Sequence, residues 1–88
     1  MWKELSEKEI ALYTGAYIAA GFTLATPAQV ETWLVAQMVY DGLPNEYNSR
    51  LEIIEWASDI GAIGDPDLGE GVVYYLAPAQ LAGQPLVR

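Results

Sequence analysis

Carboxylates are the most numerous side chains of this sequence that could act as catalytic groups or metal ligands. The chain has 88 residues, with 12 Asp and Glu, 4 Lys and Arg, and neither His nor Cys. The missing residue types exclude a thiolate nucleophile, the His-based catalytic triads and zinc held by Cys or His. Only carboxylates remain in number as acids, bases or ligands for hard metal ions.

Two groups of acids have spacings that resemble chemical sites. Glu52 and Glu55 could form a glycosidase-like pair, but no substrate cleft is indicated around them. The run at 65–70, DPDLGE, begins like a calcium loop, but the twelfth position of an EF-hand would be Leu76 instead of Glu. We therefore expect no metal site, no cofactor and no catalytic residues, and a chain that is not an enzyme.

The acids are concentrated in the middle of the chain. The net charge is −8, and residues 41–70 hold eight of the 12 acids against one base, Arg50, which gives that segment 1 − 8 = −7. A surface of this sign repels phosphate, which argues against direct binding to nucleic acid or to an anionic membrane. The plain alternative is a charged face that only keeps the protein soluble.

Two helices are predicted ahead of the acidic segment. Ser6 and Glu9 have the spacing of a capping box, which predicts a helix over about 7–20. Thr26 and Gln29 repeat that spacing with Pro27 between them, which predicts a second helix over about 27–40.

A third helix, predicted over about 47–60, carries part of the acid. Half of its wheel is apolar, and Glu52, Glu55 and Asp59 form a stripe opposite. Trp56 lies beside this stripe, where it is either the rim of a core or an interface anchor. Three polar residues near the start are candidate caps: Asn45, Asn48 and Ser49.

The rest of the chain changes character. Residues 61–71 are rich in Gly, Pro and Asp and predict a loop, and 72–76 predict a short strand, followed by an extended tail at 83–88. One strand needs a mate, either Leu86–Val87 or a strand of a second copy. The expected fold is a single mainly α domain over 1–88, with three helices and a short C-terminal β element.

The first two predicted helices are unusually apolar. Between Ile10 and Tyr40 the only charged residue is Glu31. One interpretation is a central first helix wrapped by the others, and the other is a surface for a second copy or for a different partner. The apolar stretches are too short to span a membrane, which takes about 20 residues. The candidate self-association residues are Ala11, Gly15, Ala19, Val35 and Val39.

A non-catalytic interaction role fits these patterns best. We expect the third helix and the following loop to bind a basic protein surface, such as that of a nucleic-acid-binding protein. A short, acidic, aromatic-rich chain without a catalytic motif has the composition found among phage-encoded inhibitors of the anti-defence type. The alternative is a homo-oligomeric structural or assembly subunit. The candidate partner-binding residues are Glu52, Glu55, Trp56, Asp59, Asp65, Asp67 and Glu70.

The first residues of the chain bear on its location. Acids at positions 4, 7 and 9 interrupt the basic-then-apolar order that a signal peptide needs. We therefore expect a cytoplasmic protein.

Overall fold

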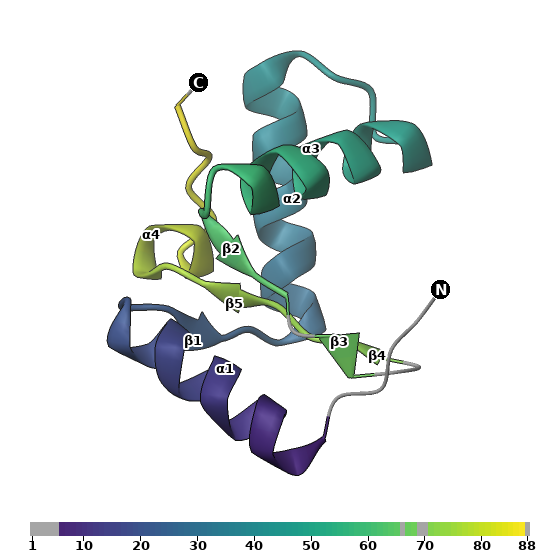
Figure 1. Cartoon of the computed structure of the whole chain (residues 1–88). Helices are drawn as coiled ribbons and strands as arrows, with labels where there is room; N and C mark the ends of the chain where they lie inside the picture. Colours follow the sequence, from purple (N-terminus) through teal and green to yellow (C-terminus); the bar gives the residue numbers. More distant parts are fainter. Residues whose placement is uncertain (1–5, 66, 69–70, 88) are drawn as a thin grey trace.

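The computed structural model describes residues 6–65, 67–68 and 71–87. Within these residues the chain is mainly α with a small antiparallel β element, which confirms the predicted fold class. Its elements follow in the order α1 (Glu7–Ala19), β1 (Thr23–Leu24), α2 (Pro27–Asp41), α3 (Tyr47–Asp59), β2 (Ile63–Gly64), β3 (Asp67–Leu68), β4 (Gly71–Val72), β5 (Tyr75–Leu76) and α4 (Pro78–Leu81) (Figure 1).

Capping boxes set the starts of α1 and α2. The Ser6 hydroxyl accepts a hydrogen bond from the Glu9 N–H at 3.2 Å, and the Glu9 carboxylate accepts one from the Ser6 N–H at 3.3 Å. Thr26 and Gln29 make the same exchange at 3.2 and 2.9 Å. Each exchange satisfies two backbone N–H groups, one of them a donor that the first turn of a helix leaves without a partner.

The start of α3 differs from the prediction. Its N-cap is Glu46, whose side chain makes no capping hydrogen bond. The Asn45 carboxamide oxygen instead accepts a hydrogen bond from the Arg50 side chain at 3.0 Å. Asn48 and Ser49 lie inside the helix, where neither side chain can cap its start. The side chain of Asn45, the earliest candidate cap, is therefore engaged by Arg50, five positions later in the chain.

The three-stranded sheet has the order β1-β5-β2, and both pairings are antiparallel. Leu76 of β5 lies opposite Thr23 of β1 on one side and Ile63 of β2 on the other. The predicted mates of this strand, Leu86–Val87 or a second copy, are wrong. Because β1 and β2 pair with the two edges of β5, neither edge of β5 is left to pair with Leu86–Val87 or with a strand of a second copy.

The boundaries of the β element also need correction. The predicted strand at 72–76 is divided between β4 and β5, and the predicted loop at 61–71 contains β2 and β3. β3 and β4 pair with each other as a second, antiparallel two-stranded unit. Strands of two residues are too short to show the alternation of polar and apolar residues that identifies a strand in a sequence.

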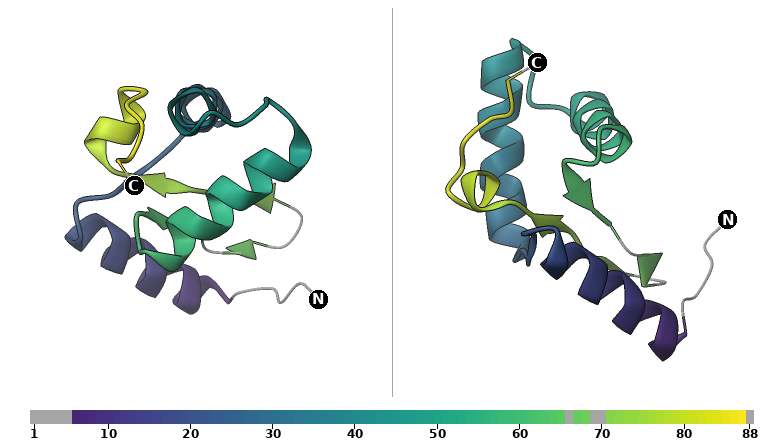
Figure 2. Two further views of the ribbon diagram at one scale, coloured as in Figure 1. Left: turned by 90° about the horizontal axis from the view of Figure 1, so that it is seen from above. Right: turned by 60° about the vertical axis from the view of Figure 1, so that its left-hand side comes forward.

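A buried side chain holds the C-terminal tail. The Gln37 carboxamide oxygen accepts a hydrogen bond from the Leu86 N–H at 2.6 Å, and its nitrogen donates to the Leu86 carbonyl at 2.9 Å. The same nitrogen donates to the Asp41 carboxylate at 3.2 Å. These bonds provide the partners that a buried amide requires, and they fix the tail alongside α2 (Figures 1 and 2).

The hydrophobic core lies between α2, α3, α4 and the sheet. Its largest fully buried apolar side chains are Trp33 and Met38 of α2, Ile53 of α3 and Leu76 of β5. The prediction of a central first helix is wrong, because no residue of α1 is buried. Figures 1 and 2 show α1 across one end of the molecule, with the bodies of α2 and α3 at the other end.

Candidate functional site

The acidic stripe, which we define as Glu52, Glu55 and Asp59, lies on the solvent side of α3. All three side chains are exposed, whereas Ile53 and Ala57 of the same helix are fully buried. Steps of three and four residues place successive acids about 4.5 and 6 Å apart along the helix axis. The carboxylates are therefore held at regular intervals on an element that the core fixes in place.

Arg50 is the base nearest in sequence to the acidic stripe, and Glu31 of α2 already binds it. Both guanidinium NH groups of Arg50 donate to the Glu31 carboxylate, each at 2.5 Å. This bidentate pair lowers the pKa of Glu31 and raises the pKa of Arg50. Within the part of the chain that the structure describes, no cation pairs with the acidic stripe.

Trp56 is only partly available as an anchor. Its side chain is half-buried and packs against the hydrophobic core. The ring therefore supports α3 from the edge of the core, and its remaining surface lies beside the acidic stripe.

Asp65 belongs to a different part of the surface. It is exposed at the end of β2, and its charge acts on two tyrosines, Tyr17 of α1 and Tyr74. Burial is the main cause of the raised pKa of both phenols, and the charge of Asp65 raises them further. The Asp67 side chain and all of Glu70 lie outside the described residues, so their predicted roles remain predictions.

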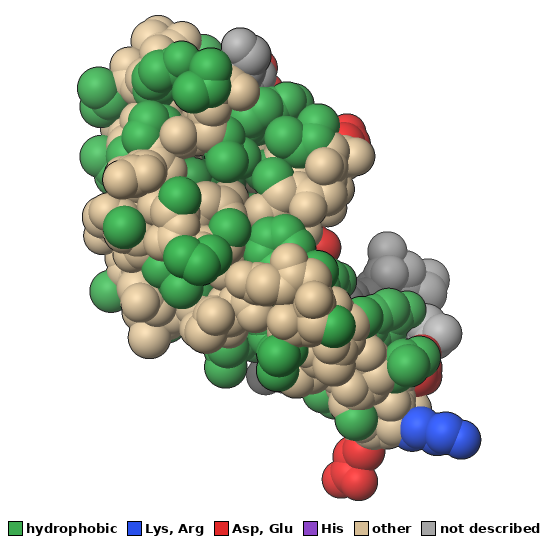
Figure 3. All heavy atoms as spheres, turned by 90° about the vertical axis from the view of Figure 1, so that its left-hand side faces the viewer, with side chains coloured by type: hydrophobic (Ala, Val, Ile, Leu, Met, Phe, Trp, Pro, Cys, Tyr) green, Lys and Arg blue, Asp and Glu red, His purple; other side chains and the backbone are tan. Residues whose placement is uncertain are grey.

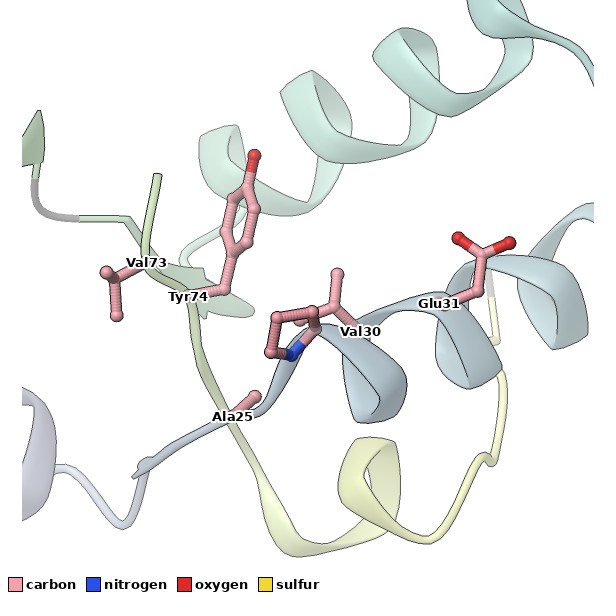
Figure 4. Close-up of a pocket in the computed structure, with 6 residues that line it drawn as sticks. Ala25, Val30, Glu31, Val73 and Tyr74 are labelled. Carbon is pink, nitrogen blue, oxygen red and sulfur yellow. The ribbon is translucent and has the colours of Figure 1, made fainter. Parts of the chain in front are cut away.

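A pocket of about 270 Å³ lies between the start of α2 and the segment before β5. Figure 4 shows Tyr74 and Glu31 on either side of Val30, with Ala25 below them and Val73 beyond Tyr74. The walls are mainly apolar, and the Glu31 carboxylate at the rim is engaged by Arg50. The volume lies just below the usual range for small-molecule sites, about 300–1,000 Å³, and suits a single large apolar side chain.

Sequence reasoning missed both the pocket and the Glu31–Arg50 pair. The pocket joins segments more than forty positions apart in the chain, for which a single sequence holds no signal. The ion pair did have a signal in the sequence. Glu31 is the lone charge of a long apolar region, and Arg50 is the lone base of the acidic segment. Two isolated opposite charges on consecutive helices are natural partners.

The five candidate self-association residues divide into two separate surfaces. Ala11, Gly15 and Ala19 are exposed on α1, and a side chain added at Gly15 would meet nothing within 4 Å. Val35 and Val39 are exposed on the second half of α2. That half of α2 points away from α1 in Figures 1 and 2, so the structure does not bring the two sets together.

Two further findings concern metals and membranes. Among the residues that the structure describes, no three acids gather into a group that could hold a metal ion. None of the helices in this same part of the chain has the length and apolar character needed to cross a membrane. No protein-family model, curated protein or solved structure matches the chain in the comparisons.

Proposed function

We propose that the chain is a non-catalytic protein-interaction module that presents the acidic stripe of α3 to a basic surface of a partner. The observation that carries this proposal is the combination of a helix packed on the core, three exposed carboxylates and a neighbouring base that is already paired with Glu31. Negative charge on this face is therefore not cancelled from within the described part of the chain.

The chemistry of the partner follows from this charge. Carboxylates at regular steps along a helix can accept hydrogen bonds from Lys and Arg side chains, as phosphates do. A surface that binds nucleic acid carries such side chains, so an inhibitor that occupies a nucleic-acid-binding site is the specific form of the proposal. Opposite charges would also speed the encounter of the two proteins.

A pair of matched variants tests the role of the stripe. The variant Glu52→Lys/Glu55→Lys changes the net charge from −8 to −4 and reverses two thirds of the stripe. Its control, Glu7→Lys/Glu46→Lys, makes the same change at two exposed acids outside the stripe. The wild-type chain and both variants would serve as bait in extracts of the native host.

We expect the wild type and the control to retain the same basic protein, and the stripe variant to lose it. Binding by the wild type should weaken as salt screens the charges, over a Debye length of about 3 Å at 1 M. If the stripe variant folds and retains the partner with wild-type affinity, the acids serve only solubility and the proposal is wrong.

A further inference from the structure

The pocket between the start of α2 and the segment before β5 combines apolar walls with two oxygen-bearing side chains. Its volume is about 270 Å³, and its aliphatic lining residues are Ala25, Pro27, Val30 and Val73. In Figure 4 the Tyr74 ring and the Glu31 carboxylate project to the same side, with Val30 between them. The rest of this face, unlike the side in Figure 3 where uncharged side chains predominate, lies next to the acids of α3. An occupant therefore meets an apolar hollow in acidic surroundings.

The rim of the pocket can accept hydrogen bonds from a cation. Glu31 accepts two hydrogen bonds from Arg50, and a carboxylate has about four acceptor positions, so about two remain on a side chain that is 51% exposed. The charge of Asp65 reaches Tyr74, where it adds to burial in raising the pKa of the phenol. With a net charge of −8, the chain as a whole attracts cations and repels anions. Charge complementarity therefore indicates an occupant with positive charge beside its apolar part.

An apolar path leads from this pocket to the acidic stripe. Arg50 of α3 reaches the rim of the pocket through its pair with Glu31. From Arg50 the surface of the helix passes Ile54, Leu51 and Glu55 in steps of about 40–60°, at about 100° per residue. Ile54 is partly buried, Leu51 is 40% exposed, and Glu55 belongs to the stripe. One partner can therefore cover both the pocket and the near edge of the stripe.

We propose that the pocket receives one large apolar side chain of the basic partner, from a segment in which Lys or Arg flank that side chain. This inference rests on the function proposed above and names the part of the partner that binds beside the stripe. Charges on the stripe speed association, whereas an apolar side chain enclosed in a pocket slows dissociation, as interface hot spots do. The alternative is a basic surface without an apolar anchor.

Three tripeptides with acetylated and amidated ends test the pocket without any host protein. Arg-Phe-Arg carries both features, Arg-Ala-Arg lacks the anchor, and Glu-Phe-Glu reverses the flanking charge. The NMR signals of the Val30 and Val73 methyl groups and of the Tyr74 ring would be followed in the full chain as each peptide is added.

We expect Arg-Phe-Arg to shift these signals and to bind about tenfold or more tightly than Arg-Ala-Arg, because burial of a large apolar side chain accounts for a factor of that size. Glu-Phe-Glu should bind several-fold more weakly at low salt, and the difference should narrow at 1 M salt, where the Debye length is about 3 Å. Unchanged Val30 and Val73 signals with Arg-Phe-Arg, or equal binding by either control peptide, would overturn the proposal.

Two variants with the same Val→Trp change locate the site. Val73→Trp places an indole at the wall of the pocket and should weaken the binding of Arg-Phe-Arg about tenfold or more. Val39→Trp, at a side chain of α2 that is 77% exposed, makes the same change away from the pocket and should leave the affinity unchanged. Equal affinities in the two variants would overturn the proposal. If Val73→Trp does not fold, the shifts in the wild type decide the question.

The stripe variant Glu52→Lys/Glu55→Lys separates this inference from the function on which it rests. It leaves the lining residues of the pocket in place, so Arg-Phe-Arg should still shift the Val30 and Val73 signals. In host extracts, a partner lost by the stripe variant but retained by Val73→Trp would support the proposed function and overturn the role of the pocket. A partner lost by Val73→Trp but retained by the stripe variant would do the reverse.

Discussion

Two helices of equal length, α1 and α3, relate to the core in opposite ways. Each has 13 residues. α3 buries Ser49, Ile53 and Ala57 and keeps its acids in solvent, whereas no side chain of α1 is more than partly buried and Leu12 and Ile18 are exposed. The comparison teaches that apolar content alone does not place a helix inside a protein. A one-sided apolar pattern does, because only one side can face the core.

The same difference predicts parts of unequal stability in the molecule. α3 packs against α2 and β2 and shares the central core with them. Thr14 and Tyr17 of α1 contact Tyr75 of β5 through a hydrogen bond and a ring stack. Elements with few buried contacts open at lower free energy than the core, so α1 should undock before the rest unfolds.

The largest expected effect comes from truncating one apolar side chain on each helix. Ile53→Ala leaves a cavity in the core and should lower the free energy of unfolding by about 2–5 kcal/mol. Leu12→Ala truncates an exposed side chain and should change the free energy of unfolding by no more than about 0.5 kcal/mol. Urea denaturation at a concentration that keeps the chain monomeric would measure both. Equal losses would mean that α1 belongs to the core after all.

The second effect concerns the point where α1 meets the sheet. A Cβ at Gly64 would collide with the Tyr17 ring. Gly64→Ala should therefore displace Tyr17 from Tyr75 and lower the stability by about 1–3 kcal/mol. Because burial is the main cause of the raised pKa of Tyr17, that pKa should fall toward its ordinary value. A spectroscopic titration of the tyrosine phenols would measure the change in the pKa of Tyr17.

The matched control for this change is Gly15→Ala, in the middle of α1. A Cβ there meets nothing within 4 Å, and replacing Gly inside a helix should stabilise the chain by about 0.5–1 kcal/mol. If Gly64→Ala left both the stability and the Tyr17 titration unchanged, the close packing of Tyr17 on β2 could not be what holds α1.

A smaller effect should follow from Tyr75→Phe. This change removes the hydrogen bond with Thr14 and keeps the ring that stacks on Tyr17. The expected loss is about 0.5–1.5 kcal/mol, the usual net value of one hydrogen bond. The comparison variant Thr14→Ser retains a hydroxyl at the same place. A double-mutant cycle with Thr14→Val should show the coupling, and additive losses would mean that the bond contributes nothing.

The smallest effect is expected at the exposed Glu31–Arg50 pair. The Arg50 hydrogen bonds lower the pKa of Glu31 in the folded chain, so the pair stabilises the fold above the ordinary pKa of Glu, about 4.3, and this contribution is lost as the pH falls through the lowered value. A carbon-detected titration should show the pKa of Glu31 returning to its ordinary value in Arg50→Gln. An unchanged pKa would mean that the pair does not persist in solution.

The sequence was sufficient for features that depend on neighbouring residues. The capping boxes at Ser6 and Thr26 and the one-sided pattern of α3 are local, and they predicted the starts of two helices and the exposure of the acidic stripe. The place of α1 was not predictable in this way. It depends on Tyr17 meeting Gly64, residues that are far apart in the chain and whose types alone do not indicate a contact.

The β element and part of the candidate site show the same limit. β1 and β2 have two residues each, and both pair with β5, which lies later in the chain. The pocket beside Tyr74 likewise exists only once β5 and the start of α2 are brought together. The local pattern of α3 predicted which of its side chains face solvent, and long-range contacts decided the rest.

Amide hydrogen exchange of the wild-type chain tests the contrast between α1 and α3 most directly. At low protein concentration, the amides of α1 should exchange much faster than those around Ile53 and Ala57 in α3, because α1 undocks without global unfolding. Exchange in α1 that is as slow as in α3 would contradict the peripheral position of α1.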